Sequence, residues 1–238
     1  MEEIVKSAKI IAIGDEGINN LKHIEEDIIG NMDIDKIEIN QDVDKDYIRS
    51  IFDGIEMLFL IYSSEDKRTS DIVKAISYMS TERRVLSIGI NTSSNDKKEE
   101  MGVNREFRLH AEELSEFTNM MNLIVESISD LTLLYLDRTD LKEVIANEKG
   151  IGYSYVEFKP NDDYYDVAKN IIGSMKSIGN EFLNKKSLMF IEGKISLEDV
   201  NKLTDCINDV KEEKYDIIFS LNLKGNDDNK VKIGLIHN

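Results

Sequence analysis

Two alternating hydrophobic periods constrain the fold of this chain more than any other feature. Short runs rich in Ile, Val, Phe and Leu read as strands, and the segments between them place apolar residues three and four positions apart, as helices that pack on a sheet do. In the first part of the chain the strand-like runs are residues 8–13, 36–39, 57–62 and 84–90, and the helical segments are 18–29, 43–52 and 70–79. This order predicts an α/β protein that begins with a Rossmann-like half.

The second part of the chain follows a polar connection at residues 91–104 and a short strand at 106–111. From Glu112 to about Leu133 apolar residues recur with helical spacing, which predicts one long buried helix. Further strand-like runs are residues 151–158, 187–192, 215–221 and 230–236, and the helical segments between them are 162–179 and 196–210. The sequence GNDDN at 225–229 predicts a hairpin between the last two strands. We therefore expect a Rossmann-like domain over residues 1–111, a central helix and loop over 112–136, and a smaller α/β domain over 137–238.

Charge and composition exclude several classes of partner. The 238 residues include 30 Lys and Arg against 47 Asp and Glu, a formal net charge of −17, which would repel nucleic acid and an anionic membrane surface. No apolar run approaches the ~20 residues that span a bilayer, and the N-terminal sequence lacks a secretion signal. The single cysteine, Cys206, lies in a helical apolar pattern, and the three histidines show no metal-ligand spacing. We expect a cytoplasmic protein that binds no nucleic acid, has no protein-built metal site and does not insert into membranes.

The connection after the first strand is the first candidate site, because ligands of open α/β sheets bind at the carboxyl ends of strands. In the sequence IIAIGDEGINN at residues 10–20, Gly14 and Gly17 would permit a tight turn, and the next helix would offer free N–H groups to an anion. Asp15 and Glu16 lie between the glycines and would repel a polyphosphate. An ordinary strand-to-helix turn with an Asn cap is the simpler interpretation.

The connection after the third strand is the second candidate. Backbone cradles for phosphate need glycines so that several N–H groups can converge, and residues 63–71 contain none. Lys67 and Arg68 could still contact an anion, but neighbouring carboxylates offset their charge. A charged helix start explains the same residues.

The sequence YLDRTDLKEVIAN at residues 135–147 sets two carboxylates three positions apart at the start of a helix. Asp140 with Glu143 fits a capping box, and Thr139 is an alternative cap. Capping does not explain Asp137, which lies one turn outside the helix, where the two carboxylates could hold a water molecule between them.

This region resembles FtsZ, the bacterial cell-division relative of tubulin. Residues 125–147, VESISDLTLLYLDRTDLKEVIAN, are similar to the family's V-Q-G-I-S-D-L run at the end of its central helix and to the N-L-D-F-A-D-V-K-T-V-M-S-N run that follows. The shared positions after the ISDL match are Leu136, Asp137, Asp140, Lys142, Val144 and Asn147. The turn after the first strand resembles the family's I-G-V-G-G-G-G-N-N loop and retains Gly14, Gly17, Asn19 and Asn20. Segments of residues 150–236 resemble the family's C-terminal domain in the same order.

The resemblance implies a mechanism and a set of residue roles. Members of the family bind GTP with magnesium in the N-terminal domain, and a loop from the next subunit in the filament supplies two aspartates that polarise the attacking water. By position, Asp137 and Asp140 would be these catalytic residues. Gly14, Gly17, Asn19 and Asn20 would be nucleotide-binding residues.

Two departures from the family pattern affect the nucleotide site. The sequence SSEDKRTSD stands where the family has its glycine-rich G-G-G-T-G-T-G loop, and Met121 stands where an aspartate contacts guanine. A thioether cannot accept the paired hydrogen bonds that guanine donates. The chain is also some tens of residues shorter than a full catalytic core.

The resulting hypothesis is an FtsZ-like protein of a bacterial cytoskeletal or cell-division system with a degenerate GTP site. It would bind GTP poorly or not at all, need no cofactor, and pair with itself or with an FtsZ-type subunit. One alternative is a GTPase whose phosphate site is rebuilt from Lys67, Arg68 and a helix N-terminus. Another is an interaction module with no link to filaments, in which the two aspartates are helix caps.

Overall fold

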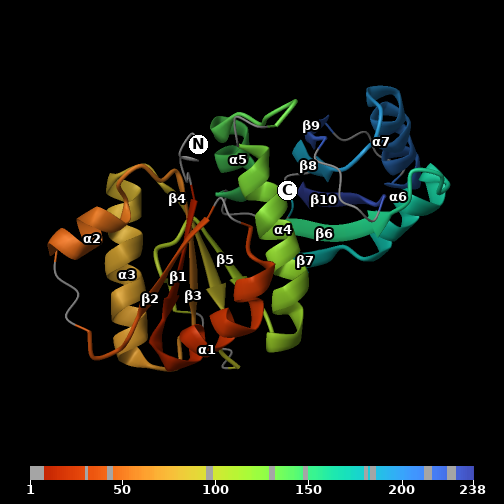
Figure 1. Cartoon of the computed structure of the whole chain (residues 1–238). Coiled ribbons are helices and arrows are strands. Elements are labelled where there is room, and N and C mark those ends of the chain that lie inside the picture. Colours follow the sequence, from red (N-terminus) through yellow and green to blue (C-terminus); the bar gives the residue numbers. More distant parts are fainter. Residues whose placement is uncertain are drawn as a thin grey trace. The chain divides into compact units, whose positions relative to one another are not determined.

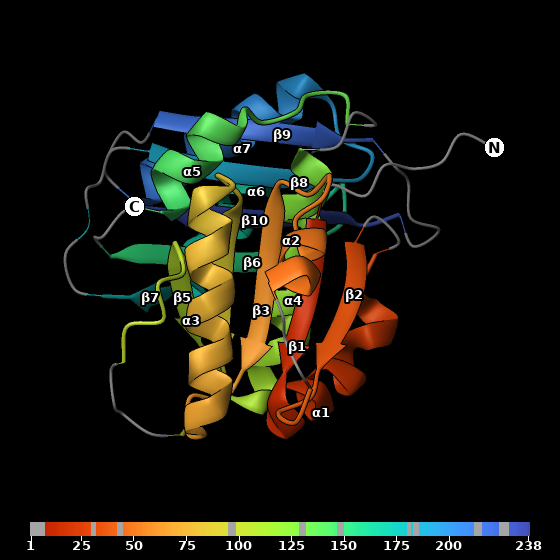
Figure 2. The same cartoon turned by 90° about the vertical axis from the view of Figure 1, so that its left-hand side faces the viewer.

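The computed structural model describes residues 8–29, 32–41, 45–94, 99–128, 132–146, 150–179, 182, 186–211, 216–223 and 229–238. The chain divides into two compact units, residues 1–119 and 120–238. Each unit contains one five-stranded sheet (Figures 1 and 2). The fold is therefore α/β throughout, as the sequence predicts.

The first unit is a parallel sheet with helices on both faces. Its strands are β1 (Ala8–Ile13), β2 (Met32–Ile37), β3 (Met57–Tyr62), β4 (Leu86–Asn91) and β5 (Arg105–Arg108), in the order β2-β1-β3-β4-β5. The helices are α1 (Gly14–Ile24), η1 (Glu25–Asp27), α2 (Lys45–Ile51), α3 (Lys67–Glu82) and η2 (Ala111–Glu113), and α4 (Leu114–Ser127) crosses the division between the units. Helices α2 and α3 cover one face of this sheet and α1 covers the other (Figure 1).

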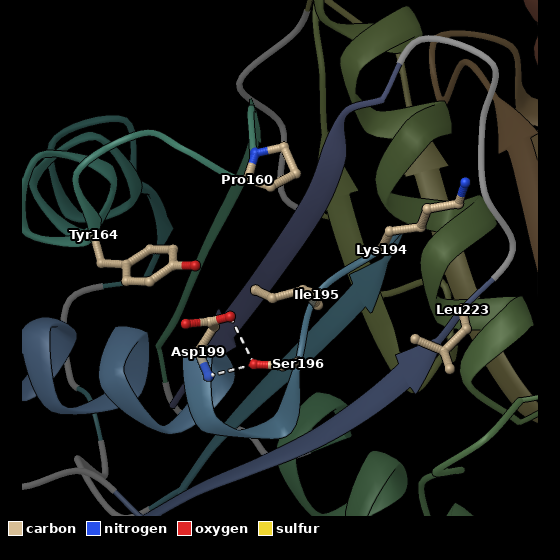
Figure 3. A pocket seen from close by; sticks show the side chains of 7 residues that line it. All are labelled: Pro160, Tyr164, Lys194, Ile195, Ser196, Asp199 and Leu223. Atoms are coloured by element: carbon tan, nitrogen blue, oxygen red, sulfur yellow. Dashed lines mark hydrogen bonds between the residues drawn. The ribbon is translucent and has the colours of Figure 1, made fainter.

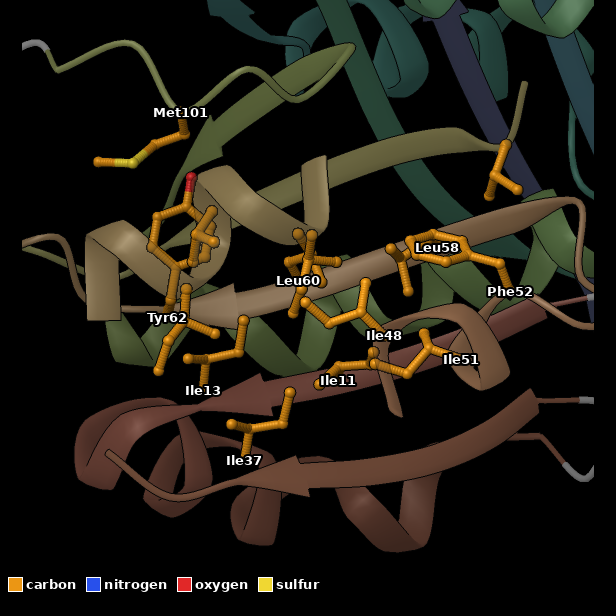
Figure 4. Close-up of a cluster of buried hydrophobic side chains, with 14 of the residues drawn as sticks. Ile11, Ile13, Ile37, Ile48, Ile51, Phe52, Leu58, Leu60, Tyr62 and Met101 are labelled. Atoms are coloured by element: carbon orange, nitrogen blue, oxygen red, sulfur yellow. The ribbon is translucent and has the colours of Figure 1, made fainter. Parts of the chain in front are cut away.

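Burial on both faces explains why the central strands of this sheet are continuous apolar runs. The residues of β3, MLFLIY, are all buried. Side chains from β1, β2 and β3 pack with those of α2 and α3 in one apolar cluster (Figure 4). This Rossmann-like arrangement places the carboxyl ends of β1, β3 and β4 at one edge of the sheet, because all three strands run parallel.

The second unit is a mixed sheet. Its strands are β6 (Ile151–Phe158), β7 (Lys176–Ile178), β8 (Lys186–Glu192), β9 (Asp216–Asn222) and β10 (Val231–His237), in the order β7-β6-β10-β8-β9. Its helices after α4 are α5 (Arg138–Ile145), α6 (Tyr164–Gly173) and α7 (Leu197–Lys211). β10 is antiparallel to both β6 and β8, and β9 is parallel to β8, so β6, β8 and β9 run in the same direction. Apolar side chains of α6 and α7 form a core cluster with those of this sheet.

Three expectations about the second half of the chain are wrong. The last two strands do not form a hairpin, because β10 lies between β6 and β8 while β9 pairs on the other side of β8. Helix α4 ends at Ser127, short of Leu133, since the chain folds back and the Leu136 N–H donates to the Ser127 carbonyl at 2.9 Å. Helix α6 ends at Gly173, and the short edge strand β7 follows it within the segment expected to be helical. Of the described helices, none is both long and apolar enough to cross a membrane.

Candidate functional site

The two glycines after β1 are explained by close contacts within the first unit. Gly14 has a φ of 74°, and a Cβ at this position would lie 2.6 Å from the Thr69 hydroxyl at the start of α3. A Cβ at Gly17 would lie 2.4 Å from the Ile61 carbonyl oxygen of β3. Packing of α1 against β3 and α3 therefore accounts for both glycines without a ligand.

The expected Asn cap of this helix is wrong. Helix α1 begins at Gly14 and its N-cap is Ile13, whose side chain has no hydrogen-bonding group. Both asparagines lie inside the helix. The Asn19 side chain accepts from the Lys22 ammonium at 3.3 Å, and the Asn20 amide donates to the Thr92 hydroxyl at 2.9 Å. Asn20 thus ties α1 to the residues that follow β4.

Backbone N–H groups in the connection from β3 to α3 donate hydrogen bonds to side chains of the protein. The Ser64 N–H donates to the Asn91 side-chain oxygen at 3.3 Å, and the Glu65 N–H donates to the Ser63 hydroxyl at 3.5 Å. Asp66 is the N-cap of α3, and its carboxylate accepts the Thr69 N–H at 2.8 Å. The Ser70 N–H donates to the Asp66 carbonyl at 3.1 Å, so Thr69 and Ser70, in the first turn of α3, both have their amide donors paired within the protein.

A buried polar network holds this connection in place. Asn91, at the end of β4, is 1% exposed and donates to the Ser64 hydroxyl at 3.0 Å and to the Glu106 carboxylate at 3.4 Å. The Tyr62 hydroxyl donates to the same carboxylate oxygen of Glu106 at 2.6 Å. Burial and the neighbouring Glu106 raise the pKa of Tyr62, so this hydroxyl stays a donor. Sequence reasoning missed Asn91 and Glu106, although a polar residue that ends an apolar strand was a usable signal.

Lys67 and Arg68, the cations expected at this site in the alternative hypothesis, are exposed in the first turn of α3. They follow directly on Asp66, whose carboxylate already occupies the helix N-terminus. Met121, on α4, is fully buried, so its thioether is packed in the interior.

The roles of the two aspartates at the start of α5 differ from the capping prediction. Asp137, not Asp140, is the N-cap, and its carboxylate accepts the Thr139 N–H at 2.7 Å. Asp140 lies in the first turn of α5 and pairs with the Lys186 ammonium at 3.2 Å. Glu143 binds the same ammonium at 2.7 Å, so the expected capping box is absent here. Hydrogen bonds from Lys186 to Glu143 and Asp140 raise the pKa of Lys186.

The segment before Asp137 exposes three consecutive apolar side chains. Leu133 is 57% exposed, Leu134 38% and Tyr135 73%. Their backbone is fixed, because the N–H groups of Leu133 and Leu134 donate to the Leu221 carbonyl of β9 and the Leu221 N–H donates to Leu134 at 2.9 Å. We call residues 133–135 the apolar loop. It is an ordered surface that presents apolar area to solvent.

Neither a metal site nor a reactive thiol emerges from the described ranges. Within them, no group of three or more His, Cys, Asp or Glu side chains is placed to hold a metal ion. Cys206 packs against the apolar cluster of the second unit. Burial, together with nearby aspartates, raises the pKa of Cys206, which makes its thiolate less available.

Solved structures of other proteins share the fold of this chain. An FtsZ dimer from M. jannaschii matches with a TM-score of 0.67 and 13% identity, over 99% of this chain and 89% of that chain. CetZ from Methanosaeta thermophila matches with a TM-score of 0.66 and 9% identity, over 97% of this chain and 86% of that chain. The chain has an FtsZ/tubulin-like fold.

A third match places the same fold in an assembly. CetZ2 from Haloferax volcanii, in a GTPγS-bound protofilament, has a TM-score of 0.60 and 9% identity over 97% of this chain and 92% of that chain. No protein-family model matches the sequence, and a comparison with curated protein sequences gives no match. The FtsZ-like fold expected from the sequence is confirmed, whereas identities of this size leave the residue roles as expectations.

Two of the segments expected to bind nucleotide, the connections after β1 and after β3, are in contact. Gly14, after β1, lies against Thr69 at the start of α3, so the two connections considered as nucleotide-binding elements meet at the same edge of the first sheet. Asp137 and Asp140 belong to the second unit.

Proposed function

We propose that this FtsZ-like chain acts in a cytoskeletal or cell-division system by assembling with itself or with FtsZ-type filaments, and that it binds GTP poorly or not at all. The observation that carries the nucleotide part is the carboxylate of Asp66, which caps α3 where a phosphate would bind. The assembly part is supported by similarity to an FtsZ dimer and to a CetZ2 protofilament, and by the apolar loop.

The sizes of the electrostatic interactions disfavour a triphosphate at the start of α3. A helix N-terminus stabilises an anion by about 0.3–1 kcal/mol when exposed. Two like charges 4 Å apart repel by about 1 kcal/mol in water and by about 4 kcal/mol at an effective dielectric constant of ~20. Asp66 is exposed, so its repulsion of a triphosphate is near the lower value and offsets the stabilisation by the helix. Glu65, next to it in the chain, adds a second negative charge.

Titration with GTP and magnesium tests the nucleotide part. We expect no saturable heat up to millimolar nucleotide, and we expect protein purified from cells to carry no guanine nucleotide. Retention of stoichiometric GTP or GDP through purification would overturn this part of the proposal and favour the alternative, a GTPase that uses Lys67 and Arg68.

Mutation of the apolar loop tests the assembly part. The double variant Leu133→Ser and Tyr135→Ser removes two exposed apolar side chains without touching the core. We expect wild-type protein to co-sediment with polymerising FtsZ, or to sediment as oligomers alone, and the variant to do neither. Tyr78→Ser is the matched control, because Tyr78 on α3 is 66% exposed and lies outside the loop.

If wild-type protein neither sediments as oligomers nor changes FtsZ polymer mass or GTP turnover, the assembly proposal is wrong. If Tyr78→Ser abolishes assembly as the loop variant does, the apolar loop is not the surface responsible.

Asp137 can be tested separately for a role beyond its cap. Asn retains the side-chain oxygen that caps α5, whereas Ala removes it at a cost of about 1 kcal/mol. If Asp137 only caps the helix, Asp137→Asn should leave the GTP turnover of a co-assembled FtsZ unchanged. If Asp137 polarises water in a neighbouring subunit, Asp137→Asn and Asp137→Ala should both lower that turnover.

A further inference from the structure

The carboxylate in the pocket of the second unit already has partners within the protein (Figure 3). Asp199 accepts the Ser196 hydroxyl at 2.6 Å and pairs with the Lys202 ammonium at 3.5 Å, and Tyr164 hydrogen-bonds to it as well. This carboxylate therefore does not select a ligand. Among the described residues, a backbone donor without a partner lies in the first unit, in the turn that follows α2.

The turn after α2 contains the dipeptide Asp53–Gly54, which is the one Asp-Gly sequence in the chain. The last turn of α2 continues into it, because the Phe52 and Asp53 N–H groups donate to the carbonyls of Arg49 and Ser50 at 3.2 and 3.3 Å. Gly54 follows with a φ of 77°, a value that favours glycine. Both residues of the dipeptide are exposed, so they form a surface turn at the end of a helix.

The Gly54 nitrogen is accessible for reaction. Its N–H makes no hydrogen bond within the part of the chain that the structure describes. A Cβ built at Gly54 would have no atom within 4 Å, and glycine itself carries no side chain that shields the nitrogen. A hydrogen bond from the following amide and a bulky following side chain are two features that protect an aspartate from attack by that amide nitrogen. Asp53 has neither protection.

Buried residues hold both ends of this turn. Phe52 is 5% exposed and Ile55 is 8% exposed, and both belong to the apolar cluster in which α2 packs on the first sheet. The exposed pair therefore bridges two fixed points. Local opening of the turn breaks only the two hydrogen bonds at the end of this seven-residue helix, so it leaves the core in place.

We propose that Asp53 converts spontaneously to isoaspartate. In the first step the Gly54 nitrogen attacks the carboxyl carbon of the Asp53 side chain, a C–N bond forms, and the carboxyl OH leaves with the amide proton as water. The product is a five-membered succinimide ring. Water then adds to one of its two carbonyl carbons: cleavage at the side-chain carbonyl restores aspartate, and cleavage at the main-chain carbonyl leaves Gly54 attached through the side chain. The sum of the steps is an isomerisation that needs water alone.

Isomerisation changes the turn, because the main chain gains one methylene group between Phe52 and Ile55 and the former main-chain carbonyl becomes a free carboxylate. The longer link no longer fits between two buried side chains, so the modified protein should melt at a lower temperature than the unmodified protein. Isoaspartate is also the substrate class of carboxyl methyltransferases that use S-adenosylmethionine, so the modified turn would be a methylation site. The reaction requires neither nucleotide nor filament, so it stands independently of the proposed function.

Ageing of the full-length protein tests the proposal. Samples are kept at physiological temperature in mildly acidic buffer and then digested with trypsin, which cleaves after Arg49 and Lys67 and releases residues 50–67. Chromatography separates peptide isomers of equal mass, and electron-transfer fragmentation locates the isoaspartate. We expect it to accumulate at Asp53 and not at Asp66, which lies in the same peptide but precedes a lysine and caps α3.

Two variants are the matched controls. Asp53→Glu keeps the charge, but its longer side chain would have to close a six-membered ring, so we expect no isomer. Gly54→Asn suits the positive φ and adds a side chain beside the nitrogen, so we expect the isomer to form severalfold more slowly. A methyltransferase specific for isoaspartate, supplied with labelled S-adenosylmethionine, should label aged wild type and not aged Asp53→Glu.

A synthetic peptide of residues 49–56 reports the reactivity without the fold, and we expect the native protein to isomerise at a comparable rate. Absence of isoaspartate from Asp53 in the native protein overturns the proposal, and its presence in the peptide would then show that the fold protects the turn. Equal accumulation at Asp66, or an equal rate in Gly54→Asn, also overturns the proposal. If aged wild type contains the isomer and melts like aged Asp53→Glu, the expected strain between Phe52 and Ile55 is refuted.

Discussion

Asp66 allows a direct test of whether the protein itself closes the start of α3. Its carboxylate accepts the Thr69 N–H at 2.8 Å, in the position that an external anion would take. Asp66→Ala removes this cap, and losses of this kind cost about 0.5–2 kcal/mol. A loss of 1 kcal/mol would lower the melting temperature by roughly 4 °C in a unit of this size.

Rescue by phosphate is the diagnostic part of the experiment. Asp66→Ala frees the Thr69 N–H at the helix N-terminus and removes one repelling charge, so inorganic phosphate can bind where the carboxylate was. An anion present at ten times its dissociation constant stabilises the folded state by about 1.4 kcal/mol. Melting curves in rising phosphate, with ionic strength held constant by chloride, should therefore show a larger increase for Asp66→Ala than for wild type.

Two further variants calibrate the result. Asp66→Asn keeps a capping oxygen and loses only the charge, so it should melt close to wild type. Asp163→Ala removes a comparable cap from α6, where the carboxylate accepts two N–H groups at 2.9 and 3.1 Å, and gives the size of a cap loss in this protein. If Asp66→Ala melts like wild type and gains nothing from phosphate, the carboxylate does not fill an anion site and the reasoning fails.

Gly17→Ala would place a Cβ 2.4 Å from the Ile61 carbonyl oxygen, so we expect a loss of about 1–3 kcal/mol in urea unfolding. Gly173→Ala, where no atom lies within 4 Å, is the control, and an equal loss there would refute the packing argument. The hydrogen bond from Lys230 holds the pKa of Glu157 below its ordinary 4.5, so the stability it contributes is present above that pH and lost as pH falls through the folded-state pKa. The stability difference between wild type and Lys230→Met should therefore shrink from pH 7 to pH 3; a constant difference contradicts the pairing.

Strand positions in this protein were predictable where burial is complete. The runs at residues 8–13, 57–62 and 151–158 coincide with β1, β3 and β6, because their apolar runs have clear ends in the sequence. Pairing was not predictable for β10, since turn residues before a strand signal a reversal of the chain and not the neighbour that the strand will choose. The insertion of β10 between β6 and β8 depends on contacts between residues far apart in sequence.

The loop before α5 shows why local spacing was insufficient at the candidate site. An acidic residue followed three positions later by another fits a helix start at either Asp137 or Asp140. The structure begins the helix at Arg138 because the preceding backbone is fixed by Leu221 on β9 and by Ser127. The partner of Asp140, Lys186, is equally remote in sequence.

The connection after β3 contains no glycine, and Asn91 and Asp66 supply acceptors for its backbone N–H groups. Each buried N–H left without a partner would cost about 1–3 kcal/mol, so the N–H groups of this connection need acceptors. Asn91 accepts the N–H groups of Ser64 and Ser93 at 3.3 and 3.1 Å, and Asp66 accepts that of Thr69. On the proposal that this connection does not bind phosphate, these side chains take the place of phosphate oxygens as acceptors. If the proposal is right, glycines placed in this connection will not create a nucleotide site unless Asn91 and Asp66 are changed as well.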